Sequence, residues 1–259
     1  MMRNVSSRAW RVWQRDLDVY RTTWKLNFLP PLLEPVLYIL AFGLGMGKLI
    51  GTISYFGEDI AYLRFMVPGV VSVAIMFWAY FETTYATFIR MVYQRTFEAI
   101  ITTPLLVEDV IAGEWLWGAT KSLLAAGLML IAVSAFGLAS WPSCLLVIPL
   151  AILGGLIFSA LGLMTTALSP TIEGFNLPIF LAIFPMFLFS GTFFPLDILP
   201  LWANAIAWLL PLTHVSLLVR GAFLGKLPPY AWASVLYLLV ATPILVVVSF
   251  RLMKKRLVK

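Results

Sequence analysis

Long apolar runs alternate with short polar segments along the whole chain. A helix that crosses a bilayer needs about 20 consecutive, mostly apolar residues. Each run is continuous and does not alternate residue by residue, so the runs predict transmembrane helices and not the strands of a membrane barrel. The predicted spans lie near residues 29–50, 65–88, 113–136, 144–168, 175–195 and 231–253.

A further apolar segment, residues 196–228, is interrupted by prolines and does not fit a complete span. Between Pro200 and Pro211 there is room for about 10 helical residues, or roughly 15 Å of helix. That is half of the hydrocarbon thickness of about 30 Å. We therefore expect short helices that enter the membrane from one surface and return to it, as a re-entrant extracellular hairpin.

Composition supports the same class. Of the 259 residues, 61% are hydrophobic and 12% are charged, and the mean hydropathy is +0.95. Soluble domains have about 25% charged residues, so this chain has too few polar groups to cover a soluble core. Cys144 is the single cysteine and allows no intramolecular disulfide. We predict an all-α integral membrane protein, residues 1–259 forming a single transmembrane domain.

Lysine and arginine predict the orientation. Six spans place both termini on one side, together with the loop 90–112. Thirteen of the 18 Lys and Arg residues then lie on that side, including Arg3 and Lys259, and four lie opposite. Positive residues mark the cytoplasmic side, so both termini are expected in the cytoplasm. The net charge of +6 follows from this distribution, and no nucleic-acid partner is expected.

Residues 5–26 are amphipathic and precede the first predicted span. The large apolar side chains recur at steps of three and four residues and fall within roughly an 80° sector of a helical wheel. Arg8, Arg11 and Arg15 occupy another sector. Indole rings favour the headgroup layer and arginine favours lipid phosphates, so we expect an interfacial helix on the cytoplasmic leaflet, turning into the first span near Asn27 and Pro30. A helix packed on a partner is the alternative. The apolar stripe consists of Trp10, Trp13, Leu17, Tyr20 and Trp24.

The loop between spans two and three concentrates charge. Residues 95–111 contain Arg95, Glu98, Glu108 and Asp109. Pro104 cannot continue a helix, and the residue before a proline is biased to extended geometry. The sequence therefore predicts a short helix from Arg95 to about residue 102 that presents residues 97 and 98 to the cytoplasm. A solvated turn without a partner is the alternative.

Three charged residues lie within predicted spans: Glu34, Glu82 and Lys121. A charge at the bilayer centre costs at least about 2.5–3.5 kcal/mol on insertion scales. Glu82 and Lys121 each lie eight residues from a span end, about 12 Å deep. We hypothesise a buried Lys121–Glu82 pair that holds spans one to three together, with Glu34 as the alternative partner of Lys121. Lys121 could instead extend alone to the interface, and a proton relay is a third possibility.

Aromatic side chains form one set on span two and another on span five. Steps of four, or of four and three, place each set on one helix face. Such faces could line an apolar route for lipid tails, or could equally face lipid or the core. The candidate path residues are Phe77, Phe81 and Tyr85, with Phe180, Phe184 and Phe187.

Several motifs together resemble the membrane subunits of type-2 ABC exporters. The loop carries Arg95-Thr96-Phe97-Glu98 and Thr102-Thr103-Pro104-Leu105, and the hairpin region carries Ser190-Gly-Thr-Phe-Phe-Pro195, Leu210-Pro-Leu-Thr-His214 and Arg220-Gly221. Glu34-Pro35, Phe42-Gly-Leu-Gly45, Phe81-Glu-Thr-Thr-Tyr85 and Gly113-Glu-Trp-Leu-Trp117 resemble the nodulation-type branch of that family. The resemblance covers nearly the whole chain.

The resemblance implies a homodimer in a bacterial inner membrane that carries two copies of a separate ATPase. The chain contains no Gly-x-x-x-x-Gly-Lys-Ser/Thr phosphate loop, so ATP and Mg²⁺ are expected in the partner and no cofactor in this chain. The cargo expected from the resemblance is a lipid-linked or amphiphilic saccharide such as a lipo-oligosaccharide, with hydrophobic drugs as the alternative. The coupling helix that contacts the ATPase would comprise Arg95, Thr96, Phe97, Glu98, Thr102, Thr103 and Pro104.

Two other classes fit the sequence less well. An ATP-independent carrier usually shows internal repeats and broken helices with polar groups near the midplane, and neither is evident. A membrane-embedded enzyme would need a catalytic motif, and the chain has no His-Glu-x-x-His or Gly-x-Ser-x-Gly. His214 is the single histidine, and we expect it to be a structural cap and not a metal ligand. A transport subunit without catalytic residues is the prediction.

Overall fold

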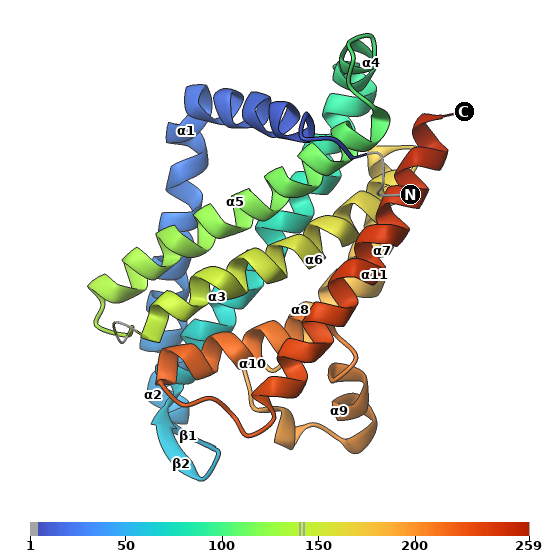
Figure 1. Ribbon diagram of the computed structural model, residues 1–259. Coiled ribbons are helices and arrows are strands. Elements are labelled where there is room, and N and C mark those ends of the chain that lie inside the picture. The colour runs from blue at the N-terminus through green and yellow to red at the C-terminus, as the bar shows by residue number, and fades with distance from the viewer. Residues whose placement is uncertain (1–4, 140, 142, 259) are drawn as a thin grey trace.

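The protein is a bundle of membrane-spanning helices (Figure 1). A computed structural model describes residues 5–139, 141 and 143–258. Within these residues six helical segments are long and apolar enough to cross a membrane. The predicted all-α integral membrane fold is confirmed. Arg3 and Lys259, which entered the charge count, lie outside the described residues.

The first span and the amphipathic segment are one helix. α1, Ala9–Leu40, continues through a π-helical stretch, Ala41–Met46, into α2, Gly47–Ile50. These 42 residues extend about 63 Å, twice the hydrocarbon thickness of about 30 Å, so half of the helix must lie outside it. Figure 1 shows the first half of α1 running across the bundle and the second half running along it. The helix begins at Ala9 and not at residue 5 as expected, and it continues through the turn into the first span.

Spans two and three flank the charged loop. α3, Tyr62–Phe81, is followed by two π-helical stretches, Glu82–Ala86 and Ile89–Tyr93. The short α4, Thr96–Ile101, forms the tip of the loop, and α5, Val107–Ala135, returns through the bundle. α4, the C-terminus and the start of α1 lie at one end of the bundle (Figure 1), which we call the α4 end.

Span four packs closely against α5. α6, Val147–Leu168, follows a 3-10 turn, Ser143–Leu146. A Cβ atom on Gly155 would lie 2.1 Å from the Ser122 hydroxyl, and one on Gly118 would lie 2.5 Å from the Ser159 hydroxyl. Small residues are therefore required at this helix crossing within the chain.

Span five is irregular. It consists of a 3-10 turn, Ile172–Phe175, then α7, Asn176–Pro178, a π-helical stretch, Ile179–Ile183, and α8, Phe184–Phe189. The span therefore ends at Phe189 and not near residue 195 as predicted. The last span, α11, Ala231–Leu257, extends four residues beyond its predicted end.

The end opposite α4 carries the remaining elements. A hairpin, β1 Thr52–Tyr55 and β2 Glu58–Ala61, follows α2, and its turn residues Phe56 and Gly57 have φ of 51° and 77°, as a two-residue primed turn requires. The sequence did not predict it. α9, Leu201–Ala207, and α10, Pro211–Leu224, are bent by 84° at the break between them. α10 is buried along almost its whole length.

The helices are unequally covered. α3 packs against α5, α6 and α10 and forms the centre of the apolar core. In contrast, α1 exposes Leu29, Leu33 and Leu37, and the fifth span exposes Leu181 and Phe184. Spans one and five therefore present broad apolar faces outside the core of this chain.

Candidate functional site

The charged loop is a short helix with a sharp entry. Arg95, immediately before α4, has a left-handed backbone with φ of 51°, which turns the chain out of the π-helical end of span two. α4 ends at the Thr102 cap, where the Thr102 hydroxyl donates to the Ala99 carbonyl at 2.7 Å and the Thr103 hydroxyl donates to the Ile100 carbonyl at 2.6 Å. Both bonds and Pro104 terminate the helix.

Phe97 does not point outward as predicted. Its ring is buried, with 1% exposure, and belongs to the apolar core. Phe97 therefore packs α4 against the bundle. Glu98 and Arg95 are exposed, and Ile101 adds an exposed apolar side chain at the same tip. A partner that binds this tip would therefore contact Glu98, Arg95 and Ile101. Phe97 instead packs against the core of this chain.

Both chain termini fasten the base of the loop. Asp109 accepts hydrogen bonds from the Ser6 amide at 2.7 Å and the Ser6 hydroxyl at 3.0 Å. Arg8 donates to the Pro104 carbonyl at 2.6 Å, so it contacts the loop directly. Lys254, near the end of α11, lies 2.5 Å from Glu108. A displacement of the loop would therefore pull on α1 and α11 together.

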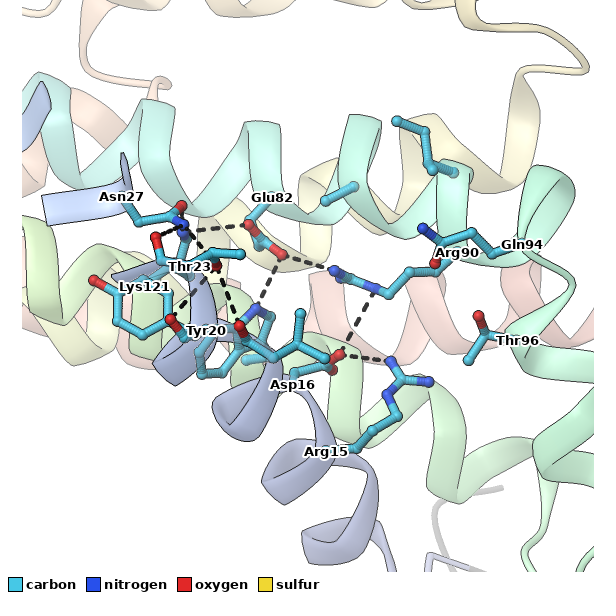
Figure 2. Close-up of a pocket in the computed structure, with 14 residues that line it drawn as sticks. Arg15, Asp16, Tyr20, Thr23, Asn27, Glu82, Arg90, Gln94, Thr96 and Lys121 are labelled. Atoms are coloured by element: carbon cyan, nitrogen blue, oxygen red, sulfur yellow. Dashed lines mark hydrogen bonds and ion pairs between the residues drawn. The ribbon is translucent and has the colours of Figure 1, made fainter. Parts of the chain in front are cut away.

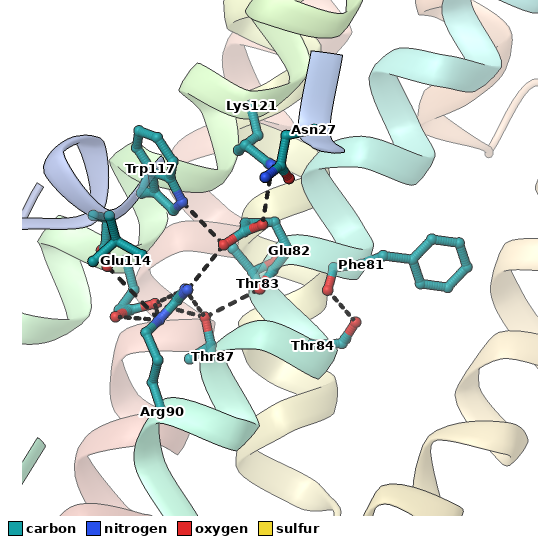
Figure 3. A network of polar contacts seen from close by, with 12 residues as sticks. Asn27, Phe81, Glu82, Thr83, Thr84, Thr87, Arg90, Glu114, Trp117 and Lys121 are labelled. Atoms are coloured by element: carbon teal, nitrogen blue, oxygen red, sulfur yellow. Dashed lines mark hydrogen bonds and ion pairs between the residues drawn. The ribbon is translucent and has the colours of Figure 1, made fainter. Parts of the chain in front are cut away.

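A buried ion network lies beneath the loop, centred on Arg90 (Figure 3). Its Nε donates to both Glu114 oxygens at 3.1 Å, and its Nη1 donates to Glu82 Oε1 at 3.0 Å. Asp16 Oδ1 lies 3.9 Å from Arg90 Nε. Arg15 Nη2 lies 2.5 Å from Asp16 Oδ1 and 3.2 Å from Glu114 Oε1. The network joins the first half of α1 to span two and α5.

Helix geometry brings the network together. Glu82 and Arg90 are eight residues apart, which places them about 80° apart on a regular α-helix. Two π-helical stretches cover this region, and each wide turn changes the rotation of the residues that follow. The two side chains consequently meet on the side that faces α5. Thr87 between them donates to Glu114 Oε2 at 2.7 Å.

The hypothesised Lys121–Glu82 pair is present, but as the weaker contact of Glu82. Lys121 Nζ lies 3.8 Å from Glu82 Oε2 and 2.8 Å from the Asn27 side-chain oxygen. Glu82 is held more closely by Arg90 and by the Trp117 indole N–H at 2.9 Å. Glu34 instead accepts a hydrogen bond from Trp78 at 3.4 Å. Three cations and three carboxylates therefore balance in the network, which consists of Arg15, Arg90, Lys121, Asp16, Glu82 and Glu114.

A cavity of about 390 Å³ opens beside this network (Figure 2). Figure 2 shows Arg15 and Asp16 at one side of it and Lys121 and Asn27 at the other. Charged groups of both signs line it, together with the hydroxyls of Thr23 and Thr96. Such a lining suits a polar group that offers both donors and acceptors.

The aromatic stripe of α1 is divided between two environments. Trp13 donates from its indole nitrogen to the Thr120 hydroxyl at 2.9 Å, and Tyr20 makes an edge contact with Trp117 at 5.7 Å. Trp10 and Trp24 are exposed, and Leu17 is half-buried. The middle of the stripe therefore packs on α5, contrary to the expectation that the whole stripe faces lipid headgroups.

A continuous row of aromatic rings connects the α4 end to the opposite end. Successive ring centroids are 5.1–5.9 Å apart, the spacing of favourable ring pairs. Four of the six predicted path residues belong to this row. The other two, Phe180 and Phe184, stack on each other at 5.1 Å and are exposed outside it. The aromatic row comprises Phe88, Phe175, Tyr85, Phe81, Phe77, Phe187, Phe193, Phe42 and Tyr38.

His214 occupies a structural position. Its Nδ1 lies 3.0 Å from the Ser234 hydroxyl and its Nε2 lies 3.0 Å from the Trp208 carbonyl. The ring also stacks on Tyr237 at 3.9 Å. His214 thus connects the bend between α9 and α10 to α11.

The sequence did not predict that Arg90, Asp16 and Glu114 are partners in one ion network. One signal was available: Glu114 lies seven residues before Lys121, about two helical turns away on nearly the same face of span three. Asp16, beside Arg15 on the polar side of an amphipathic helix, carried no sign of burial.

Comparison with known proteins gives the family. The model of the ABC-2 type transporter family matches residues 8–224. Nodulation protein J of Rhizobium leguminosarum bv. viciae is 35% identical over 252 residues, which cover 96% of this chain and 94% of that protein. Nodulation protein J of Sinorhizobium fredii is 36% identical over 215 residues, or 83% of this chain and 80% of that protein. Inner membrane transport permease YadH of Escherichia coli is 25% identical over 218 residues, or 83% and 82%. The chain therefore belongs to the ABC-2 type transporter family, as its motifs predicted.

Proposed function

We propose that this permease exports an amphiphilic, lipid-linked saccharide, of which a lipo-oligosaccharide is the model, using ATP hydrolysed by a separate subunit. The observation that carries this proposal is that the chain contains both a polar cavity and a row of aromatic rings. A polar cavity lies at the α4 end beside Arg90, and the aromatic row leads from that end to the other. The polar head of such a cargo would bind in the polar cavity, and its apolar chain would contact the aromatic row.

The ATPase partner is proposed to bind the α4 loop. α4 presents Glu98 and Arg95 outward, and its base is tied to α1 and α11 through Asp109 and Glu108. A push on α4 would therefore reach several spans at once. ATP and Mg²⁺ would be held by that partner, and two copies of it would serve a dimer of this chain.

A second copy of the chain is the proposed cover for the apolar faces of spans one and five. A groove of about 660 Å³ runs along α1 between Leu29 and Phe42, and the fifth span exposes Leu177 and Leu181. We place the dimer in a bacterial inner membrane with both termini and the α4 loop in the cytoplasm. The α9–α10 segment would then form the re-entrant extracellular hairpin.

The test is co-purification of the tagged protein in mild detergent with its ATPase partner. Glu98→Arg reverses an exposed charge on α4, and the matched control, Glu58→Arg, reverses an exposed charge in the hairpin at the opposite end. The proposal predicts that ATPase activity co-purifies with wild type and with Glu58→Arg and is lost with Glu98→Arg. Equal recovery with both variants would remove α4 as the binding surface.

The cargo is tested separately. Inverted vesicles that contain the complex are supplied with a lipid-linked oligosaccharide or with a hydrophobic dye of similar size. ATP-dependent uptake of the saccharide, reduced by Phe77→Ala in the aromatic row and not by Phe180→Ala outside it, supports the proposal. Uptake of the dye alone would instead assign hydrophobic-compound efflux.

A further inference from the structure

A buried arginine lies at the end of the bundle opposite α4 (Figure 1). Arg220, on α10, is 4% exposed, and among the described residues no carboxylate lies within ion-pair distance of it. A charge in this position is retained only where polar groups replace its hydration. The groups that surround Arg220 therefore indicate what it does.

Backbone carbonyls replace the missing anion. Arg220 Nε donates to the Phe65 carbonyl at 3.0 Å, and Nη2 donates to the Gly191 carbonyl at 2.7 Å and approaches the Thr192 carbonyl at 3.4 Å. The guanidinium also lies over the Phe65 ring at 3.9 Å. One side chain thus joins the start of α3 to the irregular segment that follows α8.

The phenol of Tyr230 supplies no negative charge. Tyr230, in the link before α11, lines the same small cavity as Arg220. Burial raises the pKa of Tyr230 to about 12, so its phenol stays neutral at physiological pH. The planar guanidinium of Arg220 instead donates hydrogen bonds to several backbone carbonyls at once.

The segment that Arg220 holds is Ser190–Phe193. Gly191 has φ of 68°, which favours glycine, and the chain there passes very close to α3. A Cβ atom on Gly69 would lie 2.6 Å from the Thr192 carbonyl oxygen. The segment can pack against α3 because Gly69 has no side chain, and the hydrogen bonds of Arg220 hold it there.

Phe193, the last residue of this segment, belongs to the aromatic row. Its ring lies 5.3 Å from Phe187 and 5.5 Å from Phe42. It is the contact through which the rings of span five meet those of span one. Moving the segment would break the row at this point.

Two buried hydroxyls in this segment are unfavourable in the position that the segment occupies against α3. Ser190 Oγ and Thr192 Oγ1 have no hydrogen-bond partner among the described residues. Water would satisfy both if the segment moved outward, so their burial favours opening. The contacts of Arg220 with the two carbonyls favour closure.

We propose that Ser190–Phe193 closes the aromatic row at the contact between the rings of spans five and one, and that Arg220 is the positioning residue that holds it closed. The inference rests on the proposed export function. It makes a claim about position that can be measured without substrate or ATPase, so the two can fail separately.

The experiment measures thiol reactivity in sealed vesicles or cells, using a membrane-impermeant thiol reagent added from outside. Cys144 is the single native cysteine, so Cys144→Ala with Thr192→Cys gives one reporter at a position with 0% exposure. Arg220→Lys keeps the positive charge but removes the planar guanidinium that donates to several carbonyls. Arg64→Lys, an exposed arginine on α3, is the matched control.

The expected result is that Arg220→Lys raises the modification rate of Thr192→Cys by about tenfold, as expected for local opening, while Arg64→Lys leaves it unchanged. Gly69→Ala, which pushes on the Thr192 carbonyl, should raise it independently. In chains that retain buried Cys144 and carry Arg220→Lys, Cys144 should stay protected.

Two results would overturn the proposal. If the rate stays within about twofold of the parent in both Arg220→Lys and Gly69→Ala, a change too small for a tenfold local opening, Arg220 does not hold the segment. If Cys144 becomes reactive to the same degree, Arg220 supports the whole bundle and does not position this segment. Neither result depends on whether the cargo is a saccharide.

Discussion

Two arginines at opposite ends of the bundle, one partly exposed and one buried, are stabilised in different ways. Arg90, at the α4 end, contacts the carboxylates of Glu82 and Glu114 and lies near that of Asp16. Arg220, at the other end, contacts backbone carbonyls and aromatic rings and, among the described residues, pairs with no carboxylate. Both side chains lie in a chain with 12% charged residues, where each buried charge needs compensation.

The difference lies in what each arrangement joins. The Arg90 network connects three helices through charged side chains, so separating the helices exposes unpaired ions to a low-dielectric interior. Arg220 connects a helix to a loop through neutral carbonyls, which water can replace at lower cost. We therefore expect the α4 end to move as a unit and the chain to open at the opposite end.

The strongest prediction concerns Glu114, which is fully buried and serves Arg90, Arg15 and Thr87. Glu114→Ala leaves two arginines without their shared anion, and loss of one partner of a buried pair costs about 3–5 kcal/mol. Unfolding in detergent, followed by denaturant titration, measures the loss. Asp18→Ala, which breaks an exposed pair with Arg21, should cost at most about 1 kcal/mol. Equal losses for both variants would show that the network does not stabilise the bundle.

A smaller loss is expected for Arg220→Met, which fills a similar volume without charge. The change removes the donor to the carbonyls of Phe65 and Gly191 but leaves no buried ion behind. The cost should be about 1–3 kcal/mol, that of buried acceptors without a donor. A loss as large as that of Glu114→Ala in the same titration would contradict the distinction between the two ends.

Lys121→Met should cost still less. Glu82 keeps its bonds to Arg90 and to Trp117, and the main loss is the bond from Lys121 to Asn27. We expect about 0.5–1.5 kcal/mol. A double-mutant cycle with Glu82→Gln measures the coupling directly, and coupling stronger than between Arg90 and Glu82 would make the lysine pair the main contact.

The smallest effect is expected in the exposed β-hairpin. Glu58 pairs with Lys226 at the surface, where both side chains are more than half exposed. Glu58→Ala should change the free energy of unfolding by less than about 1 kcal/mol, and this change should decrease further in salt. Repeating the titration at high ionic strength checks both points.

The sequence predicted most of the features that are determined within a single segment of the chain. Continuous apolar runs gave the six spans, Pro104 gave the end of α4, and the prolines near residue 200 gave short helices before the last span. The register of Phe77, Phe81 and Tyr85 on one face also followed from helical spacing. Each of these features depends on local residue pattern.

Features that depend on how helices rotate against one another were not predictable. Arg90 meets Glu114 because two π-helical stretches alter the rotation of span two, and π-helices have no simple sequence signature. Phe97 faces inward because the left-handed Arg95 reverses the entry to α4. Phe180 and Phe184 stack on each other and are exposed outside the aromatic row, which helical spacing alone did not indicate.

The most direct measurement compares both ends in the assembled complex with its ATPase. Single cysteines are placed at Thr192, in the segment held by Arg220, and at Ala86, which lines the polar cavity. Thiol modification is then followed with and without ATP and vanadate. We expect that nucleotide raises the modification rate at Thr192 by about tenfold and leaves the rate at Ala86 within about twofold, as for local opening at one end of the bundle. A rise at Ala86 without a rise at Thr192 would contradict it.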